Sequence, residues 1–131
     1  MVARPADLEV EPSVLITDDN DRWREALREL LEREGFRTLL AACGEEAVEV
    51  VQTEYLAVAL IDFHMPRIDG LETIRQIREH DALLPAVLMT AHPGDLPRAE
   101  VQRLQVTQIL EKSADRERIV TVVLSVARLR W

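Results

Sequence analysis

Three aspartates, one hydroxyl and one lysine stand where short apolar runs of this sequence end: Asp18, Asp19, Asp62, Thr90 and Lys112. Carboxylates within a few ångströms of one another repel and raise one another's pKa values unless a cation lies between them. Mg²⁺ takes a few carboxylate oxygens and keeps room for water and phosphate oxygens. An aspartate can also act as a nucleophile and carry an acyl phosphate. These residue types therefore predict a magnesium-dependent phosphoryl site, with Asp62 at the end of the central run as the acceptor.

The lysine is singular in this chain. Among the 16 lysine and arginine residues, only Lys112 is a lysine. A compact ammonium suits a tight phosphate site better than a planar guanidinium does. We expect Lys112 to supply a point charge, and Thr90 a hydroxyl donor, to the phosphate oxygens that the cation leaves free.

Five strand–helix units can position these side chains. The apolar runs are mostly apolar throughout, which is typical of strands buried on both faces, and cover residues 14–16, 36–41, 57–61, 86–89 and 106–110. Apolar spacings of three and four predict helices from Asn20 to Gly35 and over about 45–52, 71–80, 96–104 and 115–130. This order predicts an α/β fold with a parallel sheet and helices on both faces. Such sheets bind ligands at the carboxyl ends of their strands.

Four residues are expected to shape the helix ends. Asn20 and Asp95 are predicted to cap the first and fourth helices, and Gly35 to end the first in a left-handed turn. Asp69, beside Gly70, is read as a cap at the entry to the third helix and not as a metal ligand.

Composition narrows the class of protein. The 131 residues suit one domain, which we place at residues 13–131 after a loose leader at residues 1–12. A net charge of −8 argues against direct binding of nucleic acid. The N-terminus has no apolar signal region, and no apolar run reaches the roughly 20 residues of a membrane span. We therefore expect a cytoplasmic protein that does not insert into membranes.

The only cysteine, Cys43, is interpreted as structural.

Four pieces of sequence, in order, resemble the receiver domain of two-component response regulators. They are the acidic pair at 18–19, the segment DFHMPRIDG at 62–70, Thr90 with Ala91, and Lys112. The resemblance covers residues 13–130. It implies the flavodoxin-like fold of the chemotaxis regulator, a doubly wound (βα)5 sheet in the order 2-1-3-4-5. It also implies that a sensor histidine kinase or a phosphotransfer protein donates a phosphoryl group to Asp62.

The same resemblance implies a division of roles at the site. Asp19, Asp62 and the backbone carbonyl of His64 would bind Mg²⁺ directly, or Mn²⁺ in its place, and Asp18 largely through water. Thr90 and Lys112 would contact the phosphate. The domain would signal through altered protein contacts and would catalyse only its own aspartyl phosphorylation and dephosphorylation, so it would not be an enzyme in the ordinary sense.

Two positions depart from the family pattern. Ser113 follows Lys112 where the family usually has a proline in a cis peptide, which leaves open whether this bond is trans or strained. Ile109 stands three residues before the lysine, where the family often has an aromatic switch. We expect phosphorylation still to move Thr90, with a smaller or differently placed change at the surface. His64 and His92 each lie two residues after a site residue and are read either as tuning phosphate lifetime or as plain surface histidines.

Several alternatives stay open on sequence alone. The last helix is more apolar than one core-facing stripe requires, which favours a homodimer or effector contact on the face of helix four, strand five and helix five. The chain is either a single-domain regulator or a piece of a longer protein. A phosphatase of the haloacid-dehalogenase class would want an acid where His64 stands. A receiver that serves only as a scaffold would lack the acceptor or the acidic pair. A zinc site from the histidines and Cys43 has no suitable spacing.

Overall fold

The structure is a computed structural model that describes residues 11–130; residues 1–10 and Trp131 lie outside the described part. The predicted leader therefore falls almost entirely outside it. Five parallel strands form one sheet in the order β2-β1-β3-β4-β5, which confirms the predicted order. The strands are β1 (Ser13–Thr17), β2 (Arg37–Ala41), β3 (Val58–Asp62), β4 (Ala86–Thr90) and β5 (Gln108–Glu111).

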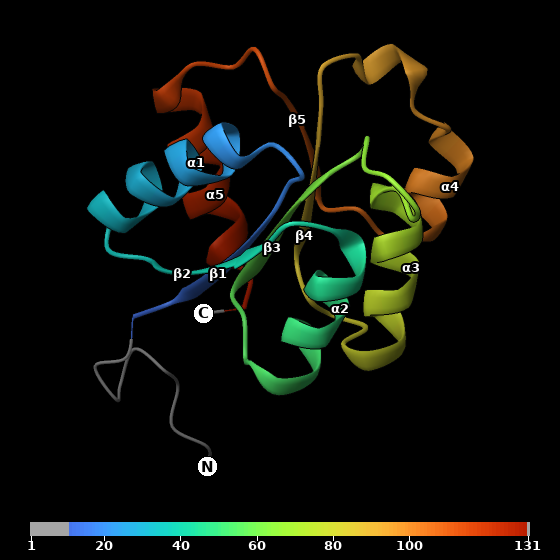
Figure 1. Cartoon of the computed structure of the whole chain (residues 1–131), viewed down its shortest axis with the longest axis horizontal. Helices are drawn as coiled ribbons and strands as arrows, with labels where there is room; N and C mark the ends of the chain where they lie inside the picture. Colours follow the sequence, from blue (N-terminus) through green and yellow to red (C-terminus); the bar gives the residue numbers. More distant parts are fainter. Residues whose placement is uncertain (1–10, 131) are drawn as a thin grey trace.

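Helices cover both faces of the sheet (Figure 1). On one face lie α1 (Asp21–Arg33) and α5 (Arg116–Ala127), and on the other lie α2 (Gly44–Thr53), α3 (Gly70–His80) and α4 (Arg98–Arg103). This is the doubly wound, flavodoxin-like arrangement that the sequence predicted. Within residues 11–130, no helix has both the length and the apolarity that a membrane crossing needs.

Successive residues of the strands enter two separate cores, because side chains of a strand alternate between its faces. Val14 and Ile16 pack into the core shared with Val123 of α5. Leu15, between them, packs into the core shared with Ile74 of α3. β1, β3 and β4 are buried at every position, whereas β2 and β5 have exposed positions because each has a neighbour on one side only. Burial on both faces thus holds for the three central strands.

Three of the four predicted helix ends are confirmed. The Asn20 side chain accepts a hydrogen bond from the Trp23 backbone N–H at 3.0 Å. Gly35 has a φ of 93°, in the left-handed region that glycine adopts without strain. The Asp69 side chain accepts a hydrogen bond from the Glu72 backbone N–H at 2.8 Å, so Asp69 is a cap.

The fourth helix differs from its prediction. Asp95 does not cap it; Asp95 ends a 3-10 turn, η2 (Pro93–Asp95), and α4 starts only at Arg98. The residue before a proline is disfavoured in the helical region. Leu96 accordingly takes an extended conformation before Pro97, with ψ at 136°, so no helix can pass through it.

The apolar residues of α5 are mostly accounted for by the core. Five of them are buried: Ile119, Val122, Val123, Val126 and Ala127. Leu124 is partly buried against the same core. The apolar composition of α5 therefore does not by itself require a partner surface.

Candidate functional site

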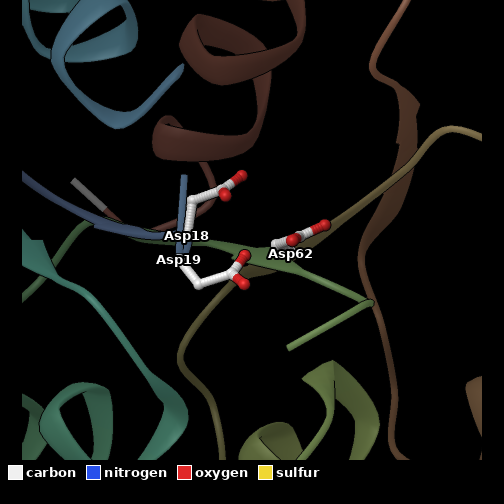
Figure 2. Close-up of side chains that lie close together, drawn as sticks. All are labelled: Asp18, Asp19 and Asp62. Atoms are coloured by element: carbon white, nitrogen blue, oxygen red, sulfur yellow. The ribbon is translucent and has the colours of Figure 1, made fainter. Parts of the chain in front are cut away.

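Two adjacent strands bring the aspartates together. β1 and β3 pair in parallel, with Thr17 beside Ile61, so the residues that follow stand side by side. Figure 2 shows the side chains of Asp18, Asp19 and Asp62 gathered at this edge. One carboxylate oxygen from each lies within 4.8 Å of the others. Asp18 is fully buried and Asp62 is 3% exposed, whereas Asp19 is exposed.

The loop from β1 to α1 fixes Asp18, the buried member of the acidic pair. The backbone N–H of Asn20 donates to Asp18 Oδ1 at 2.9 Å. Arg24, in the first turns of α1, donates from Nη1 to the carbonyl of Asp18 at 2.6 Å and from Nη2 to Asp21 Oδ1 at 2.6 Å. Both the side chain and the carbonyl of Asp18 are therefore held in place. Arg24 was not singled out from the sequence; the one available signal was its spacing of three from Asp21.

Lys112 reaches the same pocket from the end of β5. Its Nζ lies 2.8 Å from Asp18 Oδ2 and 3.2 Å from Asp62 Oδ1. Its backbone N–H donates to the carbonyl of Thr90 at 2.9 Å, which ties the loop after β5 to β4. Residues 11–130 contain no cis peptide bond, so the bond from Lys112 to Ser113 is trans. The serine in place of the family's proline does not keep the ammonium out of the pocket.

The pocket is short of positive charge. Burial, and then the charge of Asp18, raise the pKa of Asp62, and the neighbouring Lys112 only partly offsets them. Burial alone would lower the pKa of Lys112, but its ion pairs with Asp18 and Asp62 outweigh burial and raise it. One ammonium thus faces three carboxylates. Oxygen donors that carry excess negative charge are what a hard divalent cation requires.

The loop after Asp62 folds back over the acceptor. The backbone N–H of Phe63 donates to the carbonyl of Met89 at 2.8 Å, and the N–H of Gly70 donates to the carbonyl of Phe63 at 2.8 Å. A Cβ at Gly70 would lie only 2.5 Å from the carbonyl oxygen of Asp62 and 2.8 Å from Phe63 Cα. Position 70 therefore needs a glycine, because its backbone passes too close to the backbone of Asp62 and Phe63 to leave room for a side chain.

The other predicted site residues lie around this centre. Thr90, at the end of β4, is fully buried, and its hydroxyl oxygen accepts a hydrogen bond from the His92 backbone N–H at 3.1 Å. His64 and His92 are both exposed, and the His64 ring lies edge-on to the Phe63 ring with 4.7 Å between centroids. Ile109, in β5, is 37% exposed.

Comparison with known proteins defines the class. The model of the response regulator receiver domain family matches residues 14–124. The chain is 35% identical, over 72% of its length and 20% of the relative's, to the C4-dicarboxylate transport transcriptional regulatory protein DctD of Pseudomonas aeruginosa. It is 33% identical to the response regulator UvrY of Escherichia coli, over 87% of this chain and 53% of that protein. The chain thus spans about half the length, or less, of these relatives.

A solved structure gives the same fold. The receiver domain of a sensor histidine kinase from Pseudomonas aeruginosa, crystallised with magnesium coordinated in its active-site cleft, superposes with a TM-score of 0.82 at 21% identity. The superposition covers 91% of this chain and 98% of that domain. The chain belongs to the response regulator receiver domain family, and is a receiver domain of two-component signalling.

Proposed function

We propose that Asp62 accepts a phosphoryl group from the phosphohistidine of a sensor kinase or phosphotransfer protein, in a reaction that needs Mg²⁺. The observation that carries this proposal is the convergence of three carboxylate oxygens within 4.8 Å, at a pocket that the only lysine of the chain reaches. Membership of the receiver family supports the kinase as donor.

The residues present fit a magnesium ion. In the proposed site, Asp19, Asp62 and the carbonyl of His64 would hold the ion directly, and Asp18 would hold it largely through water. All of these donors are oxygens, which Mg²⁺ prefers, and Mn²⁺ can replace it. The magnesium in the active-site cleft of the related kinase receiver domain supports the same choice. When bound, the ion neutralises the carboxylates and the oxygens of the incoming phosphoryl group.

The transfer itself needs little more from the protein than position. A carboxylate oxygen of Asp62 attacks phosphorus, the bond from phosphorus to the donor's nitrogen breaks, and that nitrogen keeps the electron pair. Lys112, already within 3.2 Å of Asp62 Oδ1, donates to a phosphoryl oxygen. Thr90 donates its hydroxyl to another. Hydrolysis of the aspartyl phosphate, in which water attacks phosphorus and the Asp62 carboxylate leaves, returns the domain to its unphosphorylated state. His64 and His92 tune the rate of this hydrolysis by limiting the access of water.

The output is a changed protein contact on the face of α4, β5 and α5. A groove of about 720 Å³ lies there, and its lining includes Leu96, Val101, Ile109 and the guanidinium-bearing Arg98 and Arg118. Both a second copy of the chain and an effector protein fit this proposal. Size-exclusion mass with and without a phosphate mimic separates them, since a strict monomer in both states rejects the dimer. The net charge of −8 supports a protein partner over nucleic acid.

Labelling by a small phosphodonor tests the proposal. Intact-mass measurement after incubation with the donor and Mg²⁺ should show one phosphoryl group on the wild type and none on Asp62→Asn. Asp95→Asn removes an exposed aspartate from η2 and is the matched control, which should be labelled like the wild type. Equal labelling of Asp62→Asn would move the acceptor elsewhere, and an unlabelled wild type would favour a scaffold role.

A further inference from the structure

Trp23 lies beside the acidic pocket, close to Lys112. It is not among the site residues that the resemblance to receiver domains predicted. It stands in the first turn of α1, where its backbone N–H donates to the Asn20 side chain. Its ring centroid lies 5.7 Å from Nζ of Lys112. The remainder of the indole packs, partly buried, against the core under α1 and α5. α1 therefore brings an aromatic ring within the range of a cation–π contact with the ammonium.

The indole is not held there by its polar atom. Nε1 of Trp23 is buried and has no hydrogen-bond partner within residues 11–130. A buried N–H donor without a partner is unfavourable. A leucine would fill an apolar position without that cost. Within residues 11–130, the contact with Lys112 is the one side-chain interaction of Trp23 that requires an aromatic ring.

Lys112 needs a contact that does not depend on the carboxylates. Its side chain is 25% exposed, and its ammonium is held by Asp18 and Asp62. A divalent cation at the same carboxylates neutralises them, which weakens both ion pairs. The attraction between an ammonium and an aromatic face remains, because it arises from the quadrupole of the ring. The flexible lysine stem would otherwise be free to move into solvent.

We propose that Trp23 is a positioning residue for Lys112. When a divalent cation binds the carboxylates, the Trp23 ring keeps the ammonium at the pocket, where Lys112 can contact the phosphoryl oxygens. This inference rests on the proposed phosphoryl transfer to Asp62. A purely structural Trp23 is the competing account. In that case its substitution changes stability, and its effect on transfer is independent of Lys112.

A double-mutant cycle separates the two accounts. The cycle uses Trp23→Leu, Lys112→Met and the double variant, with the labelling rate of Asp62 by a small phosphodonor at saturating Mg²⁺ as the measured quantity. Trp23→Leu should slow labelling by about two- to fivefold, as expected for loss of a partly exposed cation–π contact. It should have no further effect when Lys112 is already methionine. Trp23→Phe, which keeps an aromatic face, should recover most of the rate. Equal fold losses in both backgrounds, or no recovery by phenylalanine, would overturn the proposal.

A second measurement needs no phosphoryl transfer. In the Trp131→Phe background Trp23 is the only tryptophan. Addition of Mg²⁺ should change its fluorescence as the ammonium leaves the carboxylates, and Lys112→Met should abolish that change. An identical change with methionine at position 112 would reject the pairing of Trp23 with Lys112. A wild type that is not labelled, but that shows the lysine-dependent fluorescence change, would instead refute the proposed function and leave the pairing intact.

Discussion

Replacing Asp62 by asparagine in the metal-free protein removes one negative charge from the pocket and should raise the free energy of unfolding. At an effective dielectric of about 20, attraction between Asp62 Oδ1 and Lys112 Nζ at 3.2 Å contributes about 5 kcal/mol. Repulsion from Asp18, whose oxygen lies within 4.8 Å, opposes it by at least about 3.5 kcal/mol, and the exposed Asp19 adds a smaller, screened repulsion. The Coulomb contributions therefore nearly cancel.

What remains is the cost of burying the charge. Asp62 is 3% exposed, and transfer of an ion from water into a protein costs several kcal/mol after relaxation. The raised pKa of Asp62, caused first by burial and then by Asp18, agrees with a net penalty on its ionised form. We expect Asp62→Asn to be about 1–3 kcal/mol more stable than the wild type near neutral pH, by urea unfolding in EDTA.

The sign of the pH dependence follows from the direction of that shift. An acid whose pKa is higher in the folded state destabilises the fold wherever the unfolded acid is ionised, and does so fully above the folded-state pKa. The advantage of Asp62→Asn should be full above the raised folded-state pKa and should shrink as the pH falls through it. It should be absent below about pH 4, where the unfolded aspartate is also protonated. Saturating Mg²⁺ should reduce the advantage by stabilising the wild type more. If Asp62→Asn is no more stable than the wild type at pH 7 without metal, burial of the Asp62 charge carries no net cost in the folded protein. Asp95→Asn is the control for net charge.

Three further substitutions test the packing and the ion pairs. Thr17→Val should raise the free energy of unfolding by about 1 kcal/mol in urea titrations, because the buried Thr17 hydroxyl has no partner within residues 11–130; a loss of stability would show that a partner exists. Gly70→Ala should lower the free energy of unfolding by about 1–3 kcal/mol in thermal unfolding, because the new Cβ would lie too close to the carbonyl of Asp62. It should also slow the labelling of Asp62, and unchanged labelling would refute the close approach. Asp81→Asn should cost about 1.5–3 kcal/mol at pH 7, because hydrogen bonds from Arg130 at 2.8 and 2.5 Å hold the pKa of Asp81 below its usual value. That cost should fall as the pH drops below the unfolded-state pKa and should be lost below the lowered folded-state pKa; an equally large cost at pH 7 and at about pH 3 would contradict it.

The fold and most of the acidic site could be predicted because each depends on local pattern. Buried strands that alternate with amphipathic helices predict a parallel sheet with helices on both faces. The strand order implied by the resemblance to receiver domains then places the ends of β1 and β3 together. The convergence of Asp18, Asp19 and Asp62 then follows from the positions of those residues at the strand ends. The sequence also predicted Lys112 at the same edge of the sheet, but it could not predict that the ammonium lies within hydrogen-bonding distance of Asp18 and Asp62.

Other features depend on distances that no pattern contains. Trp23 and Arg24 look like ordinary residues of an amphipathic helix, and only the three-dimensional contacts show that Trp23 lies near Lys112 and that Arg24 holds the Asp18 carbonyl. The late start of α4 was in principle readable, since Pro97 disfavours a helical Leu96. The predicted start of this helix, at about residue 96 with Asp95 as its cap, is therefore too early. The ion pair of Asp81 with Arg130 joins residues 49 positions apart, which spacing alone cannot indicate.

Borohydride trapping of the labelled protein tests the central claim most directly, because it converts an aspartyl phosphate to homoserine at the residue that carried it. Peptide mass spectrometry should find homoserine at position 62 after incubation with a small phosphodonor and Mg²⁺, and should find none when the metal is chelated. Homoserine at position 18 or 19, or equal conversion of position 62 without a divalent cation, would contradict the account.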